Sequence, residues 1–467
     1  MSAQPPFDVA IIGAGPGGYV AAIRASQLGL KAAVIERDTR FGGTCTLRGC
    51  IPTKALLRDA HLLHEVKKAV QQGLLKTSSI DFDFEKIQAR KTDIIGKSNK
   101  GIDYLFRKNK VTAIRGSATL LSANRIRVEG DAVTEVEAKN IIIATGSEAK
   151  PLPGYTVDEK QIITNVGALD MAAVPQSLVV VGAGAVGVEF ASLYNDFGSK
   201  VTLLEALPQL VPLEDAEVAK ELRRVFTRKG IDCHTSARLE SAKTTAAGVE
   251  VAFLADNGER KTVVAEKLLM ATGRAPNTSG IGLEALGISM ERSYIKVDRY
   301  MQTNVPGVYA IGDVVPTPQL AHVAFHEGIT AVERIAGKNP PAINYLHVPN
   351  CTYCDPQIAS VGLTEAKAVA AGHKVKTGKF PFTAVAKARI EGATDGFVKI
   401  VANEEDGEIL GVHMIGSGVT EMIAEGVTAM GLEGAVADME HLIHAHPTLS
   451  EGVHEALEAV FGAAIHI

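Results

Sequence analysis

Two cysteines are the residues best suited to chemistry in this sequence. Cys45 and Cys50 are separated by four residues in the segment GGTCTLRGCIPTK, residues 42–54. A helix-like run follows from Lys54 to Ala69, so we expect both cysteines on a first helical turn, close enough for a strained, reducible disulfide. A helix N-terminus also lowers the pKa of a thiol and favours the thiolate. One alternative is that both cysteines are buried apolar residues. The other is a zinc site, which is disfavoured because the sequence has no second Cys/His pair at ligand spacing.

A lysine and a histidine are the next candidates. Lys54 lies one turn after Cys50 and would bring a positive charge close to it. His446 precedes Pro447 and is followed five residues later by Glu451, whose carboxylate could orient the imidazole and raise its basicity. His446 is therefore the candidate general base, although on this pattern alone it could be structural. We read three nearby histidines as structural: His441, His444 and His454.

A repeated glycine motif predicts two nucleotide-binding units. GAGPGG begins at residue 13 and GAGAVG at residue 182, each after a short apolar run and before a helix-like stretch. Such glycines permit a tight turn and let a pyrophosphate approach a helix N-terminus. In both copies an acidic residue follows the first glycine by 23 positions, where it can bind a ribose. One copy could be an ordinary glycine-rich turn, but the paired spacing favours two dinucleotide sites. The residues are Gly13, Gly15, Gly18 and Glu36 in the first copy and Gly182, Gly184, Gly187 and Glu205 in the second.

The second acidic residue also predicts which nucleotide is preferred. Glu205 would accept a hydrogen bond from an adenosine ribose and would disfavour a 2′-phosphate. The next residues, 206–208, are Ala-Leu-Pro and supply no arginine to receive such a phosphate. The second site should therefore prefer NAD(H) to NADP(H).

Short apolar strands frame these motifs. Asn140–Ile143 runs into Ala-Thr-Gly at 144–146, Lys267–Met270 runs into the same tripeptide at 271–273, and Val308–Ile311 leads to Gly312 and Asp313. Beyond residue 347 the pattern changes to α+β, with strands near 358–361, 397–401 and 409–415 and helices over 419–430 and 450–464. We expect an α/β fold in four parts: residues 1–150 with the cysteine pair, 151–275 with the second nucleotide site, a central segment 276–345, and an α+β domain 346–467.

The composition excludes several classes of protein. The 467 residues carry 48 Lys+Arg and 53 Asp+Glu, a net charge of −5, which argues against nucleic acid as the main partner. No uninterrupted apolar run reaches the roughly 18 residues needed to span a bilayer. The N-terminus has no basic region, so we expect no signal or transit peptide. Five cysteines make no structural disulfide framework, and a cytoplasmic location is expected.

Taken together and in order, these motifs resemble those of the pyridine nucleotide–disulfide oxidoreductases. The cysteine segment and the segment His446-Pro447-Thr448 with Ser450-Glu451 are specific, and the glycine motifs are less so. The resemblance covers essentially the whole chain and is greatest to the members that oxidise dihydrolipoamide for 2-oxo-acid dehydrogenase complexes. It implies two Rossmann-like domains for FAD and NAD, a C-terminal dimerisation domain and a Cys45–Cys50 redox disulfide.

The resemblance also assigns roles to individual residues. The first glycine motif and Glu36 match the FAD site, and the second motif with Glu205 matches the NAD site. Asp313 would bind the ribityl chain of the flavin, and Lys54 would lie beside the flavin ring, paired with Glu189. Glu189 could instead be a solvated helix residue. Further cofactor-binding positions are Thr44, Thr145, Gly146, Gly312, Ala321 and Gly273.

The implied reaction needs two chains in each active site. His446 of the partner subunit, oriented by Glu451, would take a proton from dihydrolipoamide, and the resulting thiolate would attack Cys45. Cys50 would leave as a thiolate and pass electrons to FAD, and NAD⁺ would accept hydride. We expect the lipoyl group to come from a partner, the lipoyl domain of a 2-oxo-acid dehydrogenase or glycine cleavage complex.

Four alternative functions fit these motifs less well. A glutathione-type disulfide reductase would resemble an NADPH enzyme, and Glu205 disfavours the 2′-phosphate of NADPH. A mercuric reductase would need a C-terminal cysteine pair, and a soluble transhydrogenase would lack Cys50. A non-catalytic interaction protein would not need the cysteines, the base and its carboxylate together.

The chain departs from the family pattern at three positions. Leu47 stands where Asn is usual, two residues after the first active-site cysteine, and could shift the potential of the disulfide. Cys351 and Cys354 are unusual at the start of the last domain. We read them as two strand cysteines that point to opposite faces, with a secondary redox pair as the alternative. Cys233 fits no motif.

Overall fold

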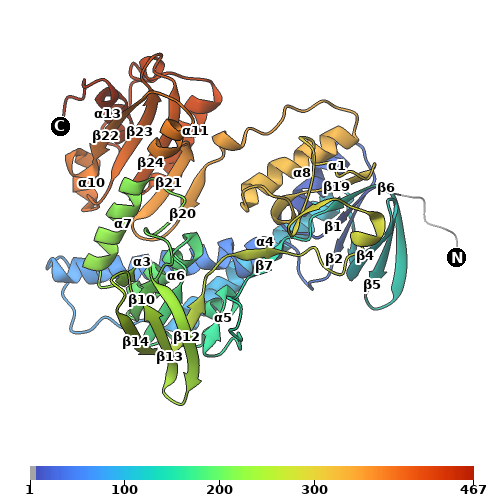
Figure 1. Ribbon diagram of the computed structural model, residues 1–467, viewed down its shortest axis with the longest axis horizontal. Coiled ribbons are helices and arrows are strands. Elements are labelled where there is room, and N and C mark those ends of the chain that lie inside the picture. Colours follow the sequence, from blue (N-terminus) through green and yellow to red (C-terminus); the bar gives the residue numbers. More distant parts are fainter. Residues whose placement is uncertain (1–6) are drawn as a thin grey trace. The chain divides into compact units, whose positions relative to one another are not determined.

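The structure is a computed structural model that describes residues 7–467 (Figure 1). The expectation that a targeting peptide is absent rests partly on residues 1–6, which lie outside the described residues. The chain divides into two compact units, each made of three segments. The first contains Met1–Ala55, Lys86–Lys150 and Arg274–Ile343, and the second contains Leu56–Glu85, Pro151–Gly273 and Asn344–Ile467. The four predicted domains stay a prediction.

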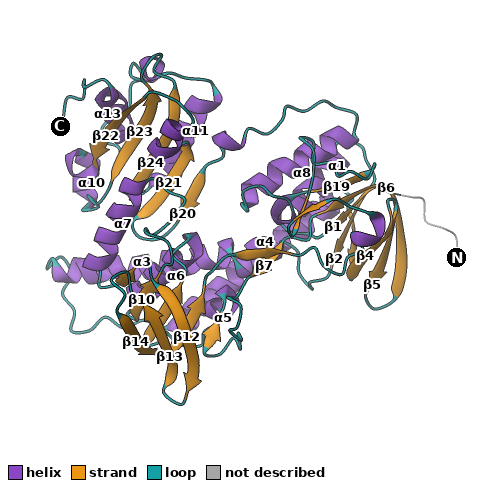
Figure 2. Cartoon of the chain, in the orientation of Figure 1, coloured by secondary structure: helices purple, strands orange, loops and turns teal. Residues whose placement is uncertain are grey.

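The first unit is built on a seven-stranded sheet in the order β3-β2-β1-β6-β5-β4, with β19 also pairing with β6 (Figure 2). The pairs among β3, β2, β1, β6 and β19 are parallel, whereas β4, β5 and β6 pair antiparallel. β1 and β2 are buried along nearly their whole length, which is typical of parallel strands in an α/β fold. The strands are β1 Phe7–Ile12, β2 Ala32–Glu36, β3 Thr112–Arg115, β4 Ser117–Ser122, β5 Arg125–Glu129, β6 Val133–Ile143 and β19 Val308–Ala310.

Glycine contacts join the two helices that cover this sheet. α1 (Pro16–Gln27) links β1 to β2 and packs against α8 (Ala321–Ile335). A Cβ atom at Gly17 would lie 3.0 Å from the carbonyl oxygen of Ala324, and one at Gly328 would lie 2.8 Å from the carbonyl oxygen of Gly17. Only residues without a Cβ let the two backbones approach so closely.

Two helices, and not one, carry the cysteines. α2 spans Gly43–Arg48 and α3 spans Cys50–Gln71, so the prediction of a first turn shared by both cysteines is wrong. The reason is Gly49, whose backbone leaves the helical region at φ −143° and ψ −112°. A Cβ atom there would lie 2.9 Å from the carbonyl oxygen of Thr44, so the turn requires glycine. The next helix, α4, spans Phe84–Lys108.

The second unit contains a sheet of five parallel strands in the order β11-β10-β9-β15-β8. α6 (Ala185–Phe197) connects β9 to β10 as α1 connects β1 to β2, so the prediction of two βαβ openings is confirmed. The strands are β8 Ile162–Ile163, β9 Ser177–Val181, β10 Lys200–Leu204, β11 Asp232–His234 and β15 Lys267–Met270. α5 (Asn165–Leu169), α7 (Ala216–Arg228) and an antiparallel layer of β12 Arg238–Thr245, β13 Gly248–Leu254 and β14 Arg260–Ala265 complete this part.

The C-terminal part of the second unit is an antiparallel sheet in the order β20-β21-β24-β23-β22. α11 (Val419–Gly431) packs on β21 and β24, and α13 (Glu451–Val460) packs on β22 and β23 around one apolar core. α13 corresponds to the helix predicted over 450–464 and ends four residues earlier, at Val460. The strands are β20 Asn350–Thr352, β21 Gln357–Gly362, β22 Val375–Pro381, β23 Phe397–Asn403 and β24 Ile409–Gly416, and the short helices are α9 Glu365–Ala370, α10 Ala386–Glu391 and α12 Val436–Met439.

The remaining pieces are short connections. Strand β7 (Ser147–Ala149) pairs with β16 (Arg274–Pro276), and β17 (Met290–Glu291) pairs with β18 (Tyr294–Ile295). Single turns of 3₁₀ helix occur at Glu284–Leu286, Gly312–Val314, Tyr345–His347 and Phe382–Ala384. The predicted α/β class, with two Rossmann-like sheets and an α+β C-terminal domain, is confirmed. No helix among residues 7–467 is long and apolar enough to cross a membrane, and the cytoplasmic location stays a prediction.

The packing of α13 on β22 predicts a sensitive glycine. A Cβ atom at Gly378 of β22 would lie 2.0 Å from the carbonyl oxygen of Ala456 in α13. Gly378→Ala should therefore push the helix away and cost about 1–3 kcal/mol, measured as a lower urea midpoint of unfolding. Gly431→Ala is the matched control, because no atom lies within 4 Å of its Cβ position. Equal midpoints for the two variants would contradict this packing.

Candidate active site

The turn at Gly49 brings the two cysteines together. Cys45 is the third residue of α2 and Cys50 is the first residue of α3. The side chains of Cys45 and Cys50 are hydrogen-bonded to each other, Cys50 is exposed and Cys45 is partly buried. Both are free thiols in this structure. The two sulfurs are thus placed as a pair although their helix is broken.

The environment of the pair decides which sulfur keeps its proton. The Cys50 side chain and burial raise the pKa of the Cys45 thiol far above its usual range. The positive charge of Lys54 and the backbone of Cys50 oppose this change in the pKa of Cys45. Burial and the neighbouring Cys50 thus disfavour the thiolate form of Cys45, and Lys54 supplies the positive charge that a thiolate needs.

The cysteine segment rests directly on the first glycine motif. The Gly42 N–H donates to the Ala14 carbonyl oxygen at 2.8 Å. A Cβ atom at Gly43 would lie 2.7 Å from the Cα of Gly15, the N-cap of α1. The contact between these backbones places the thiols beside whatever group the first motif binds.

The first glycine motif forms the cradle that a dinucleotide needs. Gly13 adopts φ +105°, and a Cβ atom there would lie 2.3 Å from the carbonyl oxygen of Ala144. A Cβ atom at Gly18 would lie 1.9 Å from the carbonyl oxygen of Gly13, so strand and helix meet without side chains between them. No described side chain caps α1, and its N-terminus is suited to a phosphate. The buried Glu36 accepts from the Ala14 N–H at 2.8 Å, at the edge of this cradle.

The second motif repeats this geometry. Gly182 adopts φ +98° with its Cβ position 2.4 Å from the carbonyl oxygen of Ala271, and the Cβ position of Gly187 is 1.8 Å from the carbonyl oxygen of Gly182. Gly184 is the N-cap of α6 at φ −70° and ψ −177°, close to the φ −68° and ψ −174° of its counterpart Gly15 in the first motif. Glu205 accepts from the Ala183 N–H at 2.7 Å. Two equivalent cradles are therefore present, each suited to one dinucleotide.

A polar cluster in the first unit surrounds Asp313. Asp313 lies in a 3₁₀ turn after Gly312, and its carboxylate accepts a hydrogen bond from the Ser147 hydroxyl. Arg274 Nε lies 3.7 Å from the same carboxylate and donates to the Ser147 hydroxyl at 2.7 Å. Sequence reasoning missed Ser147 and Arg274, although Arg274 directly follows the Ala-Thr-Gly turn at 271–273.

The other predicted FAD positions lie in the same unit. Thr145 donates to the carbonyl oxygen of Asn277 at 2.7 Å, and the Gly146 carbonyl oxygen accepts from the Asn277 N–H at 2.8 Å. Thr44 donates to the Ser147 carbonyl oxygen at 3.4 Å, and Ala321 begins α8. These contacts connect the cysteine segment to the turn that follows β6. Gly273, which is also a predicted cofactor-binding position, has φ +114° in the second unit.

The predicted base and its carboxylate are in contact. His446 Nδ1 lies 2.8 Å from Glu451 Oε1, and Oε2 accepts from the Thr448 N–H at 2.8 Å. Burial opposes ionisation of Glu451, but the Thr448 N–H and His446 lower its pKa below the usual 4.5. The His446 side chain is 71% exposed, so the imidazole is accessible to a group outside this chain.

A neighbouring histidine holds the loop that carries the base. His444 Nε2 lies 2.6 Å from Glu425 of α11, and its ring lies 5.3 Å from that of His454 in α13. Interpreting His444 and His454 as structural agrees with these contacts.

Glu189 is buried, so the alternative of a solvated helix residue is wrong. It is 5% exposed in α6 and accepts from the Tyr353 N–H at 2.9 Å. Its pairing with Lys54 stays a prediction. Cys351 lies in β20 but Cys354 lies beyond it, so the interpretation of both as strand cysteines holds only for Cys351.

Two of the three other cysteines are poorly suited to redox chemistry. Burial raises the pKa of Cys233 to about 12 and that of Cys354 well above its usual range. Cys351 packs against the C-terminal core.

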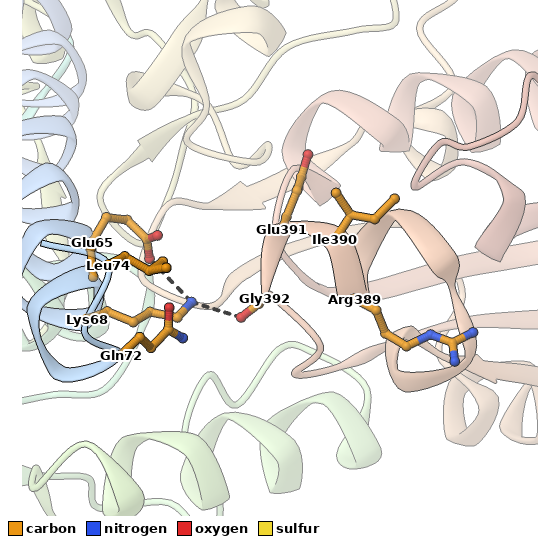
Figure 3. Close-up of a pocket in the computed structure, with 9 residues that line it drawn as sticks. Glu65, Lys68, Gln72, Leu74, Arg389, Ile390, Glu391 and Gly392 are labelled. Atoms are coloured by element: carbon orange, nitrogen blue, oxygen red, sulfur yellow. Dashed lines mark hydrogen bonds and ion pairs between the residues drawn. The ribbon is translucent and has the colours of Figure 1, made fainter.

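A pocket in the second unit lies apart from these residues. It encloses about 330 Å³ between the end of α3 and α10 (Figure 3). Lys68 Nζ donates to the Gly392 carbonyl oxygen at 2.8 Å and lies 3.6 Å from Glu65. None of the predicted site residues lines this pocket.

The lowered pKa of Glu451 predicts the pH range in which its carboxylate takes up a proton. Because its folded pKa is below 4.5, its bonds to His446 and Thr448 stabilise the loop fully above that pH and are lost as the pH falls through the lower value. A carboxyl carbon NMR titration should place Glu451 below 4.5, and Thr448→Pro, which removes the N–H donor, should raise that value. A midpoint at or above 4.5 in the unaltered chain would contradict the geometry.

Comparisons with known proteins show the family of this chain. The model of the pyridine nucleotide-disulphide oxidoreductase family matches residues 7–328, and that of its dimerisation domain matches residues 348–457. Dihydrolipoyl dehydrogenase of Bacillus subtilis is 45% identical, over 98% of this chain and 99% of that protein. Dihydrolipoyl dehydrogenase 1, mitochondrial, of Arabidopsis thaliana is 42% identical, over 98% and 91%.

Solved structures show the same fold. LpdA from Mycobacterium tuberculosis has a TM-score of 0.88 at 29% identity, covering 96% of this chain and 98% of that one. The HOCl-induced flavoprotein disulfide reductase RclA from Escherichia coli has a TM-score of 0.86 at 26% identity, covering 97% and 99%. The family uses FAD and NAD(H), for which the two cradles are suited. With paired thiols lying against one of two nucleotide cradles and family models matching most of its length, the chain belongs to the pyridine nucleotide-disulphide oxidoreductases.

Proposed function

We propose that this chain oxidises dihydrolipoamide to lipoamide with NAD⁺ as the electron acceptor, through Cys45, Cys50 and FAD. The observation that carries the proposal is the contact of the two thiols on a segment packed against the first glycine motif. Relatives named dihydrolipoyl dehydrogenase, 45% identical over nearly the whole chain, support this choice of substrate. The proposal makes the Cys45–Cys50 disulfide the oxidised form of the pair.

The cysteines divide the work of the first half-reaction. A thiolate of dihydrolipoamide attacks the sulfur of Cys45, a mixed disulfide forms, and Cys50 leaves as a thiolate stabilised by the charge of Lys54. The second substrate thiol, once deprotonated, attacks the substrate sulfur of the mixed disulfide, which releases lipoamide and leaves the Cys45 sulfur to take up a proton. Bound FAD supplies the electron-accepting chemistry between this dithiol and NAD⁺.

His446 of the partner subunit is the base in this proposal. Its imidazole is exposed, and Glu451 holds Nδ1, so that Nε2 is the atom available to take the substrate proton. The family's dimerisation domain is present, and a two-fold dimer would bring this residue to the cysteines of the other chain. The lipoyl group would reach the site on a lipoyl domain of a 2-oxo-acid dehydrogenase or glycine cleavage complex.

The proposal is tested by turnover of the purified, FAD-loaded protein. NAD⁺ should be reduced rapidly by dihydrolipoamide and NADP⁺ at least tenfold more slowly, because the buried carboxylate of Glu205 would accept a hydrogen bond from a ribose hydroxyl and would repel a 2′-phosphate. Cys45→Ser should abolish the activity, whereas Cys233→Ser, the control, should retain it. Flavin-loaded protein that reduces glutathione disulfide with NADPH, and does not oxidise dihydrolipoamide, would contradict the proposal.

The role of the base gives a separate prediction. His446→Gln should reduce dihydrolipoamide oxidation by about 10²–10⁴-fold, the range for loss of a general base. Oxidation of NADH by ferricyanide, which needs no substrate thiol, should persist in the same variant. Loss of both activities would mean that the substitution acts on the fold or the cofactors and not on proton transfer.

A further inference from the structure

A buried lysine in the second unit has no part in the proposed reaction. Lys399 of β23 is 1% exposed, yet its ammonium contacts three carboxylates. Its Nζ lies 3.2 Å from both oxygens of Asp215, 2.9 Å from Glu217 and 2.6 Å from Glu365. A buried charge is costly unless it is paired, and such groups are retained where they specify an arrangement.

This cluster joins the C-terminal sheet to the segment that follows β10. Asp215 is the N-cap of α7 and accepts from the Glu217 N–H at 3.0 Å, while α7 packs against β24 (Figure 1). The residue before it, Glu214, is 7% exposed and accepts from Asn350 of β20 at 2.5 Å. Two consecutive carboxylates are thus held by two strands of the C-terminal sheet.

A continuous path of hydrogen bonds leads from these residues to the second glycine motif. The Glu214 N–H donates to the Val211 carbonyl oxygen at 2.9 Å, and the Val211 N–H donates to the Ala183 carbonyl oxygen at 2.8 Å. The Ala183 N–H donates to Glu205 at 2.7 Å. Val211 has φ +41°, a strained backbone for a β-branched residue, which persists only where its surroundings hold it.

We infer that Lys399, Asp215 and Glu214 form a positioning network that holds the loop of residues 206–214 and, through it, the ribose-binding carboxylate of the NAD site. The C-terminal sheet thereby contributes to nucleotide affinity without touching the nucleotide. The inference rests on the proposed NAD site at the second glycine motif.

Binding of NADH to the FAD-loaded protein tests the network. Lys399→Met and Glu214→Ala should each raise the dissociation constant roughly three- to tenfold, the effect of about one lost hydrogen bond. Both should raise the KM for NAD⁺ while leaving kcat and the KM for dihydrolipoamide within twofold of the unaltered protein. Glu214→Gln keeps an acceptor for Asn350 and should restore binding toward the unaltered value.

Two further variants separate the possible failures. Lys374→Met removes an exposed lysine whose Nζ lies 2.6 Å from Glu405, and should leave binding unchanged. Glu205→Ala should weaken binding, and if it does not, the proposed NAD site and the network both fail. If Glu205→Ala weakens binding but Lys399→Met and Glu214→Ala do not, the network alone is wrong. A lower kcat together with a higher KM for both substrates would also overturn the network. If Lys399→Met does not fold, the comparison of Glu214→Ala with Glu214→Gln decides by the same criteria.

Discussion

Close contact between backbones, possible only at glycine, is the constraint on which the rest of this structure depends. The Cβ positions of Gly18 and Gly187 lie within 2 Å of carbonyl oxygens of their own motifs, and that of Gly43 lies 2.7 Å from Gly15. Side chains at these positions would separate the strand from the helix and the cysteine segment from the first cradle. With them absent, each helix N-terminus stays accessible to a phosphate, and the thiols lie against one of the two cradles.

The two cradles are alike in geometry but differ in what covers them. In the first, Gly17 lets α8 pack on α1, and the cysteine segment lies against Gly15. In the second, Val186 occupies the position of Gly17 and is 40% exposed, so this part of α6 is left accessible. The repeat therefore gives two cradles of one geometry, and a second helix packs on the first of them.

Much of the fold and of the candidate site could be predicted from the sequence, because the decisive signals were local. The strands, the glycine motifs and the contact between His446 and Glu451 follow from residues close together in the chain. The break at Gly49 was missed because glycine is tolerated inside helices, and only its contact with Thr44 shows why the helix ends. Arg274 and Lys399 were missed for another reason. Each has a partner more than a hundred residues away, Ser147 for Arg274 and Asp215, 184 residues from Lys399, and no periodicity records such contacts.

The central claim is that Cys45 and Cys50, and no other cysteines, exchange electrons with dihydrolipoamide. It is tested most directly by alkylating the thiols of the FAD-loaded protein under anaerobic denaturing conditions, before and after one equivalent of dihydrolipoamide, and assigning them by peptide mass spectrometry. The account predicts that the peptide with Cys45 and Cys50 gains two alkylatable thiols on reduction, while Cys233, Cys351 and Cys354 react equally in both samples. New thiols at Cys351 and Cys354, or no change at Cys45 and Cys50, would contradict it.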